Sequence, residues 1–145
     1  MNEALAEIGQ LIARYGPLAD AGDAAGAASL WTEDGVYAVG GMAEARGRAA
    51  IAGLLQGPEH QALLAAGCAH ILSAPAVALA ADGVSAVAVN HSIVLRRDES
   101  GGYAIHRVAA NRWELISTAD GWRIRRRDNC LLDGTAEARA LLALG

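Results

Sequence analysis

Residues 84–132 read VSAVAVNHSIVLRRDESGGYAIHRVAANRWELISTADGWRIRRRDNCLL, and this stretch decides the fold. Apolar residues alternate with polar ones through three runs, which is typical of β-strands with one buried face. The runs are separated by residues 98–102 and 119–121, which contain the Asp and Gly residues of tight turns. The stretch therefore predicts three long antiparallel strands, at residues 84–97, 103–117 and 122–132.

A further strand is expected just upstream, over residues 70–80. Pro75 has no N–H to donate, so it should interrupt or bulge this strand. Asp82-Gly83 is a hairpin signal and connects it to the next strand. At the C-terminal end, Thr135 is expected to cap a short helix that ends at residue 144.

The N-terminal part reads mainly as helix, because its apolar residues recur every three or four positions. The spacing predicts a helix over 3–22 that is kinked at Pro17, and three more over 24–30, 48–56 and 58–66. A turn at 33–35, a short strand at 36–39 and a loop at 40–47 are expected in between. The order predicts an α+β fold, in which N-terminal helices cover a curved antiparallel sheet and enclose a pocket.

The bulk properties fit one soluble domain spanning 1–145. The chain has 145 residues, 53% of them hydrophobic, and a net charge of −4. Because the chain is mildly acidic, we expect no nucleic-acid partner and no membrane association, although its 12 basic residues, all Arg, include a local run near residues 123–127. No signal-peptide pattern is evident, and the spacing of Cys68 and Cys130 fits isolated thiols. These features predict a cytoplasmic protein.

Four segments carry a family resemblance: RYGPLADAGDAAGAASLWTEDGVY (14–37), GRAAIAGLL (47–55), HILSAPAVALAADGVSAVAV (70–89) and NRWELISTADGWRIRRR (111–127). Together they resemble the SnoaL-like branch of the nuclear transport factor 2-like superfamily, in order and over nearly the whole chain. The resemblance implies an α+β cone with a ligand pocket. It says little about function, because the superfamily includes isomerases, dehydratases, cyclases and non-enzymatic binders.

Asp20 and His70 are the candidate catalytic pair. They match the positions at which scytalone dehydratase and hexachlorocyclohexane dehydrochlorinase, two members of the superfamily, have an Asp that orients a His. A carboxylate on one ring nitrogen fixes the tautomer and makes the other nitrogen a better base. The alternative is that Asp20 only ends a helix or binds a turn amide.

Four further residues are candidate substrate-binding groups. Tyr15 matches the oxyanion-stabilising Tyr of ketosteroid isomerase, although a core aromatic is the simpler interpretation. The base of that isomerase matches Val39, which cannot accept a proton, so the steroid mechanism is disfavoured. Asn111 matches a pocket Asn of the dehydratase, and His91 matches its second pocket His.

The dehydratase also has two pocket tyrosines that are missing here, at the positions of Ala19 and Val39. Tyr37 lies two residues before Val39 on the same strand face and is a candidate substitute. These departures argue against scytalone itself as the substrate.

The arginine row near the end of the last strand has two interpretations. Regular alternation places Arg123, Arg125 and Arg127 on one face. The same alternation places Trp122, Ile124 and Arg126 on the other. We favour a solvated outer face or a subunit interface for the first set, but an inward Arg would bind a carboxylate.

No metal site and no cofactor are expected. Residues His60, His70, His91 and His106 lack the close spacing of metal ligands, and no Gly-rich phosphate motif follows a strand.

Three functions remain open at this point. The first is a cofactor-free lyase (dehydratase) or isomerase acting on a small apolar, oxygenated molecule, with His70 as base. The second is a non-enzymatic binding or assembly module, such as a ring-hydroxylating dioxygenase small subunit. The third is a polyketide-tailoring enzyme like SnoaL, in which Asp20 is the acid/base. The resemblance also implies a homodimer, with a trimer as the alternative.

Overall fold

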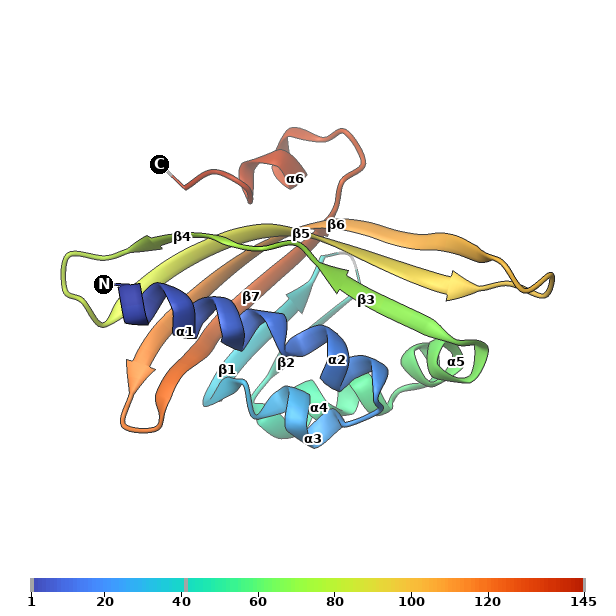
Figure 1. The fold of residues 1–145 in the computed structure, drawn as a ribbon, viewed down its shortest axis with the longest axis horizontal. Coiled ribbons are helices and arrows are strands. Elements are labelled where there is room, and N and C mark those ends of the chain that lie inside the picture. The colour runs from blue at the N-terminus through green and yellow to red at the C-terminus, as the bar shows by residue number, and fades with distance from the viewer. Residues whose placement is uncertain (1, 41, 145) are drawn as a thin grey trace.

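The computed structural model describes residues 2–40 and 42–144. A curved, unclosed sheet has the helices of the N-terminal half on its concave side and the last helix, near the C-terminus, on its convex side (Figure 1). The strands are β1 (Trp31–Val39), β2 (Ala43–Arg46), β3 (Cys68–Leu72), β4 (Ala76–Leu79), β5 (Ser85–Arg97), β6 (Tyr103–Thr118) and β7 (Gly121–Leu131). The helices are α1 (Asn2–Ala13), α2 (Tyr15–Asp20), α3 (Ala24–Ala28), α4 (Arg48–Gln56), α5 (Pro58–Ala66) and α6 (Ala136–Ala140).

The predicted α+β class and the long hairpin strands are confirmed. The strand order is β2-β1-β7-β6-β5-β3, and β4 also pairs with β5. The expected strand over 70–80 is present as β3 and β4, separated around Pro75 as its missing N–H requires. Antiparallel pairing places Asn111 of β6 opposite Asn90 of β5 and Asn129 of β7, so polar residues cluster at mid-sheet.

The first strand and its neighbour depart from expectation. β1 begins at Trp31 rather than at residue 36, and the expected turn at 33–35 is an irregularity within it. Trp31 is fixed there because its Nε1 donates to the carbonyl of Val36 at 3.0 Å. β1 runs parallel to β7, and β2 occupies the expected loop at 40–47. The sheet is thus mixed rather than wholly antiparallel.

The helix ends follow from local chemistry. The expected helix over 3–22 breaks at Arg14, before Pro17, since the proline ring excludes the carbonyl four residues earlier. Asp23 caps α3 as predicted, and its side chain accepts from the N–H of Gly26 at 2.8 Å. Thr135 caps α6 in the same way at 3.3 Å, but this helix ends at Ala140 rather than at residue 144.

The hydrophobic core lies between α1–α4 and the concave face of the sheet. Its largest fully buried apolar side chains come from α1 (Ile8, Leu11 and Ile12), from α4 (Ile51) and from the sheet (Trp31, Trp113 and Ile124). Burial of a side chain of this size stabilises the fold by about 1.5–3 kcal/mol. The apolar stripe predicted for the first helix therefore packs on the sheet as expected.

A β-bulge at Arg125 changes which face of β7 is buried. Leu115 of β6 lies opposite Ile124 and Glu114 lies opposite Arg126, so Arg125 is the extra residue. Alternation resumes one residue out of step, which turns Arg127 toward the concave face. The predicted grouping of Arg123, Arg125 and Arg127 on one face is therefore wrong.

The convex face is partly covered by α6 (Figure 1). Arg112 points outward from β6 and donates to the carbonyl of Ala143 at 2.6 Å, which fixes the C-terminal segment over the sheet. Ile71, Tyr103 and Ile105 remain at least half exposed. The homodimer stays a prediction. Within residues 2–40 and 42–144, no helix is long and apolar enough to cross a membrane.

Candidate active site

A pocket of about 440 Å³ opens between the helices and the concave face of the sheet. Apolar side chains supply much of its wall, including Leu55, Leu63, Leu72 and Val94. Its polar wall contains Tyr15, Tyr37, Glu59, His60, His70, Ser92, His106, Arg107, Arg127 and Asn129. The volume suits a small organic molecule held by a few polar groups.

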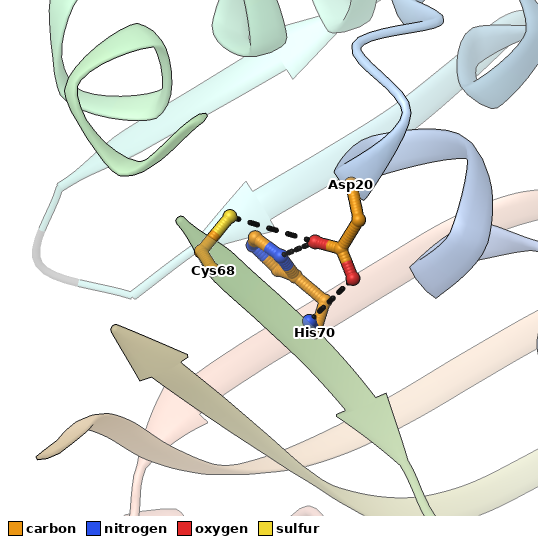
Figure 2. Close-up of side chains that lie close together, drawn as sticks. All are labelled: Asp20, Cys68 and His70. Atoms are coloured by element: carbon orange, nitrogen blue, oxygen red, sulfur yellow. Dashed lines mark hydrogen bonds and ion pairs between the residues drawn. The ribbon is translucent and has the colours of Figure 1, made fainter. Parts of the chain in front are cut away.

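Asp20 and His70 form a tight pair at this pocket (Figure 2). The Nδ1 atom of His70 lies 2.6 Å from Oδ1 of Asp20, and the backbone N–H of His70 donates to Oδ2 at 2.8 Å. Because a carboxylate only accepts, Nδ1 carries the ring proton and Nε2 keeps a lone pair. His70 lines the pocket, whereas Asp20 is not among the described residues that do so. Of these two residues, His70 is therefore the one that a molecule in the pocket would contact.

The sequence brings these two residues together through an edge strand and a glycine. β3 lies at the edge of the sheet, so the outward N–H of His70 lacks a strand partner, and Asp20 satisfies it. Asp20 is the last residue of α2, and from there its side chain reaches the N–H of His70. Gly16 of α2 faces the carbonyl of His70, and a Cβ at that position would overlap this oxygen. A residue larger than Gly would push α2 away from β3.

The electrostatics of the pair favour a neutral imidazole. Burial lowers the pKa of His70 from its ordinary value, and the hydrogen bond and charge of Asp20 oppose this only in part. At neutral pH, His70 is therefore unprotonated on Nε2 and able to accept a proton.

Cys68 adds a thiol beside the pair. Its Sγ lies 3.6 Å from Oδ1 of Asp20. Burial and this carboxylate raise the pKa of Cys68 to about 11, so it remains a thiol at neutral pH. Asp20, Cys68 and His70 place potential metal-ligand atoms within 4.8 Å of one another. In this arrangement Oδ1 of Asp20 accepts from both the His70 ring and the Cys68 thiol, so the three groups form a hydrogen-bond network.

Arg127 is a buried cation in the same pocket. It is 2% exposed, and its Cζ lies 4.5 Å from the ring of Tyr15, 4.7 Å from Tyr37 and 4.3 Å from Trp113. Such cation–π contacts contribute about 0.5–2 kcal/mol each. Burial also raises the pKa of Tyr15, so its hydroxyl keeps its proton. The guanidinium thus lies among three aromatic rings, and no carboxylate of the described residues forms an ion pair with it.

A chain of polar side chains supports Arg127 from beneath. Asn111, fully buried, accepts from Nε of Arg127 at 3.0 Å and from Nδ2 of Asn129 at 2.8 Å. Its own Nδ2 donates to Oγ of Ser92 at 2.9 Å. Arg107 donates twice to Oδ1 of Asn129, at 3.1 and 2.8 Å. The network fixes the orientation of the polar groups that line the pocket.

The structure places the predicted site residues in three positions. Tyr15, Tyr37 and His70 line the pocket. Asn111 lies beneath it, where it positions pocket residues instead of lining the wall itself. His91 is exposed on the convex face, so its expected place in the pocket is wrong. Its neighbour Ser92 lines the pocket, because adjacent strand residues point to opposite faces.

Sequence reasoning missed several pocket residues, among them His60 and Ser92, and it favoured an outward position for Arg127. His60 is buried, its Nε2 lies 2.9 Å from the carbonyl of Ala19, and its ring centroid lies 5.4 Å from that of His70. The signal for His60 was its three-residue spacing from Leu63 on the buried face of α5. The outward position was favoured for Arg127 because a bulge leaves no mark in the alternation pattern.

Comparisons with known proteins agree with this architecture. A model of the SnoaL-like domain family matches residues 2–128. An NTF2-like protein with a cystatin-like fold from Novosphingobium aromaticivorans is 55% identical, with a TM-score of 0.93 over 98% of this chain and 90% of that chain. No match was found among curated proteins.

Two more distant structures share the fold. Aln2 from a Streptomyces species is 21% identical, with a TM-score of 0.82 over 96% of this chain and 98% of that chain. ActVI-ORFA from Streptomyces coelicolor is 24% identical, with a TM-score of 0.76 over 90% of this chain and 98% of that chain. Since the family model covers most of the sequence, the chain belongs to the SnoaL-like domain family of nuclear transport factor 2-like proteins.

Proposed function

We propose that this protein is a cofactor-independent lyase (dehydratase) or isomerase that acts on a small apolar, oxygenated molecule. The observation that carries the proposal is the 2.6 Å contact between His70 Nδ1 and Asp20 Oδ1 at the wall of the pocket. In such a pair the carboxylate positions the ring and stabilises the imidazolium once it forms. His70 is the catalytic base, and Asp20 is its positioning residue.

The reaction begins when Nε2 of His70 takes a proton from a carbon next to a carbonyl group. The electron pair of the C–H bond moves toward the carbonyl oxygen and gives an enolate. In a lyase, a hydroxyl on the adjacent carbon then leaves as water, taking the proton back from His70. In an isomerase, His70 returns the proton to a different carbon. Both routes balance without a redox cofactor, because no oxidation state changes overall.

The pocket favours this chemistry over acid/base catalysis by Asp20 itself. Both carboxylate oxygens of Asp20 already accept hydrogen bonds from His70, and Asp20 is not among the described pocket-lining residues. A mechanism with Asp20 as the acid/base would require this contact to open. The non-enzymatic binding module shares the same pocket and differs only in giving His70 no role in turnover.

The test is turnover by a His70→Ala variant. A panel of β-hydroxy ketones and conjugated enones is screened with the wild-type protein, and dehydration or isomerisation is followed by mass spectrometry and ultraviolet absorbance. We expect kcat to fall by about a hundredfold or more, the usual contribution of a general base. His91→Ala is the matched control, because His91 lies on the convex face. Unchanged turnover in His70→Ala would sink the proposed mechanism.

A further inference from the structure

In the side-chain network beneath the pocket, the donor and the acceptor of each hydrogen bond can be assigned, starting from Arg107. An arginine only donates, and two of its nitrogens bind the same oxygen, Oδ1 of Asn129. The other end of that amide, Nδ2, must therefore donate, and Oδ1 of Asn111 accepts from it at 2.8 Å. Arg127 Nε donates to the same oxygen of Asn111 at 3.0 Å. The orientation of both amides is therefore set by cations.

This assignment of donors and acceptors determines what Ser92 can do. Nδ2 of Asn111 donates to Oγ of Ser92 at 2.9 Å, and Nδ2 of Asn129 lies 3.5 Å from the same atom. Both partners are donors, so the hydroxyl proton of Ser92 must point elsewhere. Among the residues that the structure describes, no group accepts it. Ser92 lines the pocket and is 7% exposed, so its O–H is available to a bound molecule.

Arg127 is linked to this hydroxyl through Asn111, and one of its nitrogens lacks a hydrogen-bond partner among the described residues. Ser92 and Arg127 bind the two ends of the same Asn111 amide, and both line the pocket. In the described part of the chain, Nη1 of Arg127 is buried without a hydrogen bond, and no carboxylate forms an ion pair with this residue. A buried charge without a counter-charge is expensive, and an anion in the pocket would offset that penalty.

We propose that Ser92 Oγ–H and the guanidinium of Arg127 form a two-donor subsite that selects an anionic oxygen on an apolar molecule. A carboxylate or phenolate of the ligand would meet both donors while its apolar body lies against the leucines of the pocket. The inference rests on the proposed function only through the shared pocket. If that function holds, the same donors stabilise the enolate oxygen formed when His70 removes a proton.

The test compares two probes of the same shape, naphthoate and its neutral amide, naphthamide. Binding is followed by isothermal titration calorimetry and by the fluorescence of Trp113, whose ring contacts Arg127. We expect wild-type protein to bind naphthoate at least about tenfold more tightly, since hydrogen bonds to charged groups contribute that much. Equal affinity for the two probes would overturn the inference.

Variants assign the preference to the subsite. Arg127→Met should abolish the preference for naphthoate, and Ser92→Ala should reduce it severalfold while the protein stays folded. Arg125→Met is the matched control, since Arg125 is exposed two residues away on the same strand, and it should keep the wild-type ratio. A wild-type ratio in both Arg127→Met and Ser92→Ala would overturn the inference.

A His70→Ala variant separates this inference from the proposed function. We expect it to keep the preference for naphthoate even though turnover is lost. Turnover that survives in His70→Ala therefore counts against the mechanism alone, whereas a missing preference in wild-type protein counts against the subsite alone.

Discussion

Replacing Asp20 by Asn tests the geometry of the pair without changing its shape. The carboxylate accepts from both the ring and the backbone of His70. The backbone N–H is a fixed donor, so the amide oxygen of Asn should turn toward it. The amide NH₂ then faces Nδ1 and donates to it, which moves the ring proton to Nε2. In this tautomer, the pocket-facing nitrogen has no lone pair and cannot act as a base.

The expected losses of stability and of activity in Asp20→Asn follow from the two hydrogen bonds that the Asp20 carboxylate accepts from His70. Losing a charge-assisted hydrogen bond lowers the free energy of unfolding by about 1.5–3 kcal/mol. The loss of activity is larger, because a base in the wrong tautomer forfeits a contribution of about 10²- to 10⁴-fold. We therefore expect a folded Asp20→Asn protein whose kcat/KM falls by a factor within that range.

The assay for the tautomer needs no substrate. Nitrogen-15 NMR of protein labelled at histidine distinguishes a protonated from an unprotonated ring nitrogen. In wild-type protein we expect His70 to be protonated at Nδ1, and in Asp20→Asn at Nε2. Asp23→Asn is the control, because Asn caps a helix as well as Asp does. A His70 ring that stays protonated at Nδ1 in Asp20→Asn would refute this reasoning.

Three further predictions concern pH, thiol reactivity and packing. Burial lowers the pKa of His70 below its ordinary value of 6.5, so kcat/KM should rise with pH and reach half its maximum below pH 6.5. A midpoint above pH 6.5 would contradict the role of His70 as a buried base. Because the Asp20 carboxylate helps to raise the pKa of Cys68, Asp20→Asn should speed alkylation of that thiol by iodoacetamide, and an unchanged or slower rate would count against the contact. Gly16→Ala should lower the melting temperature and the activity together, since its methyl group would overlap the His70 carbonyl. The control is Gly9→Ala, which has open space around the added methyl group and should be neutral or stabilising by up to about 1 kcal/mol. Equal melting temperatures for the two variants would show that the close approach of α2 to β3 is not required.

The sequence predicted the elements whose signals are local. Alternation and Asp-Gly turns located β5, β6 and β7, and Asp23 and Thr135 were recognised as caps from their residue type and position. The parallel pairing of β1 with β7 could not be read in the same way. It joins segments far apart in the sequence, since Val36 pairs with Arg126, and no local pattern encodes such a partner.

The candidate site was predicted in part, and its errors have one cause. Each strand face depends on a period of two, so a shift of one residue reverses it. The sequence analysis predicted that His91 points into the pocket, but its neighbour Ser92 does so instead. It favoured an outward position for Arg127, because the alternation pattern gives no sign of the bulge at Arg125. The family resemblance brought Asp20 and His70 together correctly, since both match motif positions rather than strand faces.

The measurement that tests the central claim most directly is deuterium exchange at carbon in heavy water. A ketone with acidic protons beside its carbonyl, bound in the pocket, should exchange them through Nε2 of His70, whether or not elimination follows. Proton NMR follows the loss of the C–H signal. We expect exchange above the buffer rate in wild-type protein and in His91→Ala, and none above that rate in His70→Ala. Equal exchange in wild-type protein and His70→Ala would contradict this expectation.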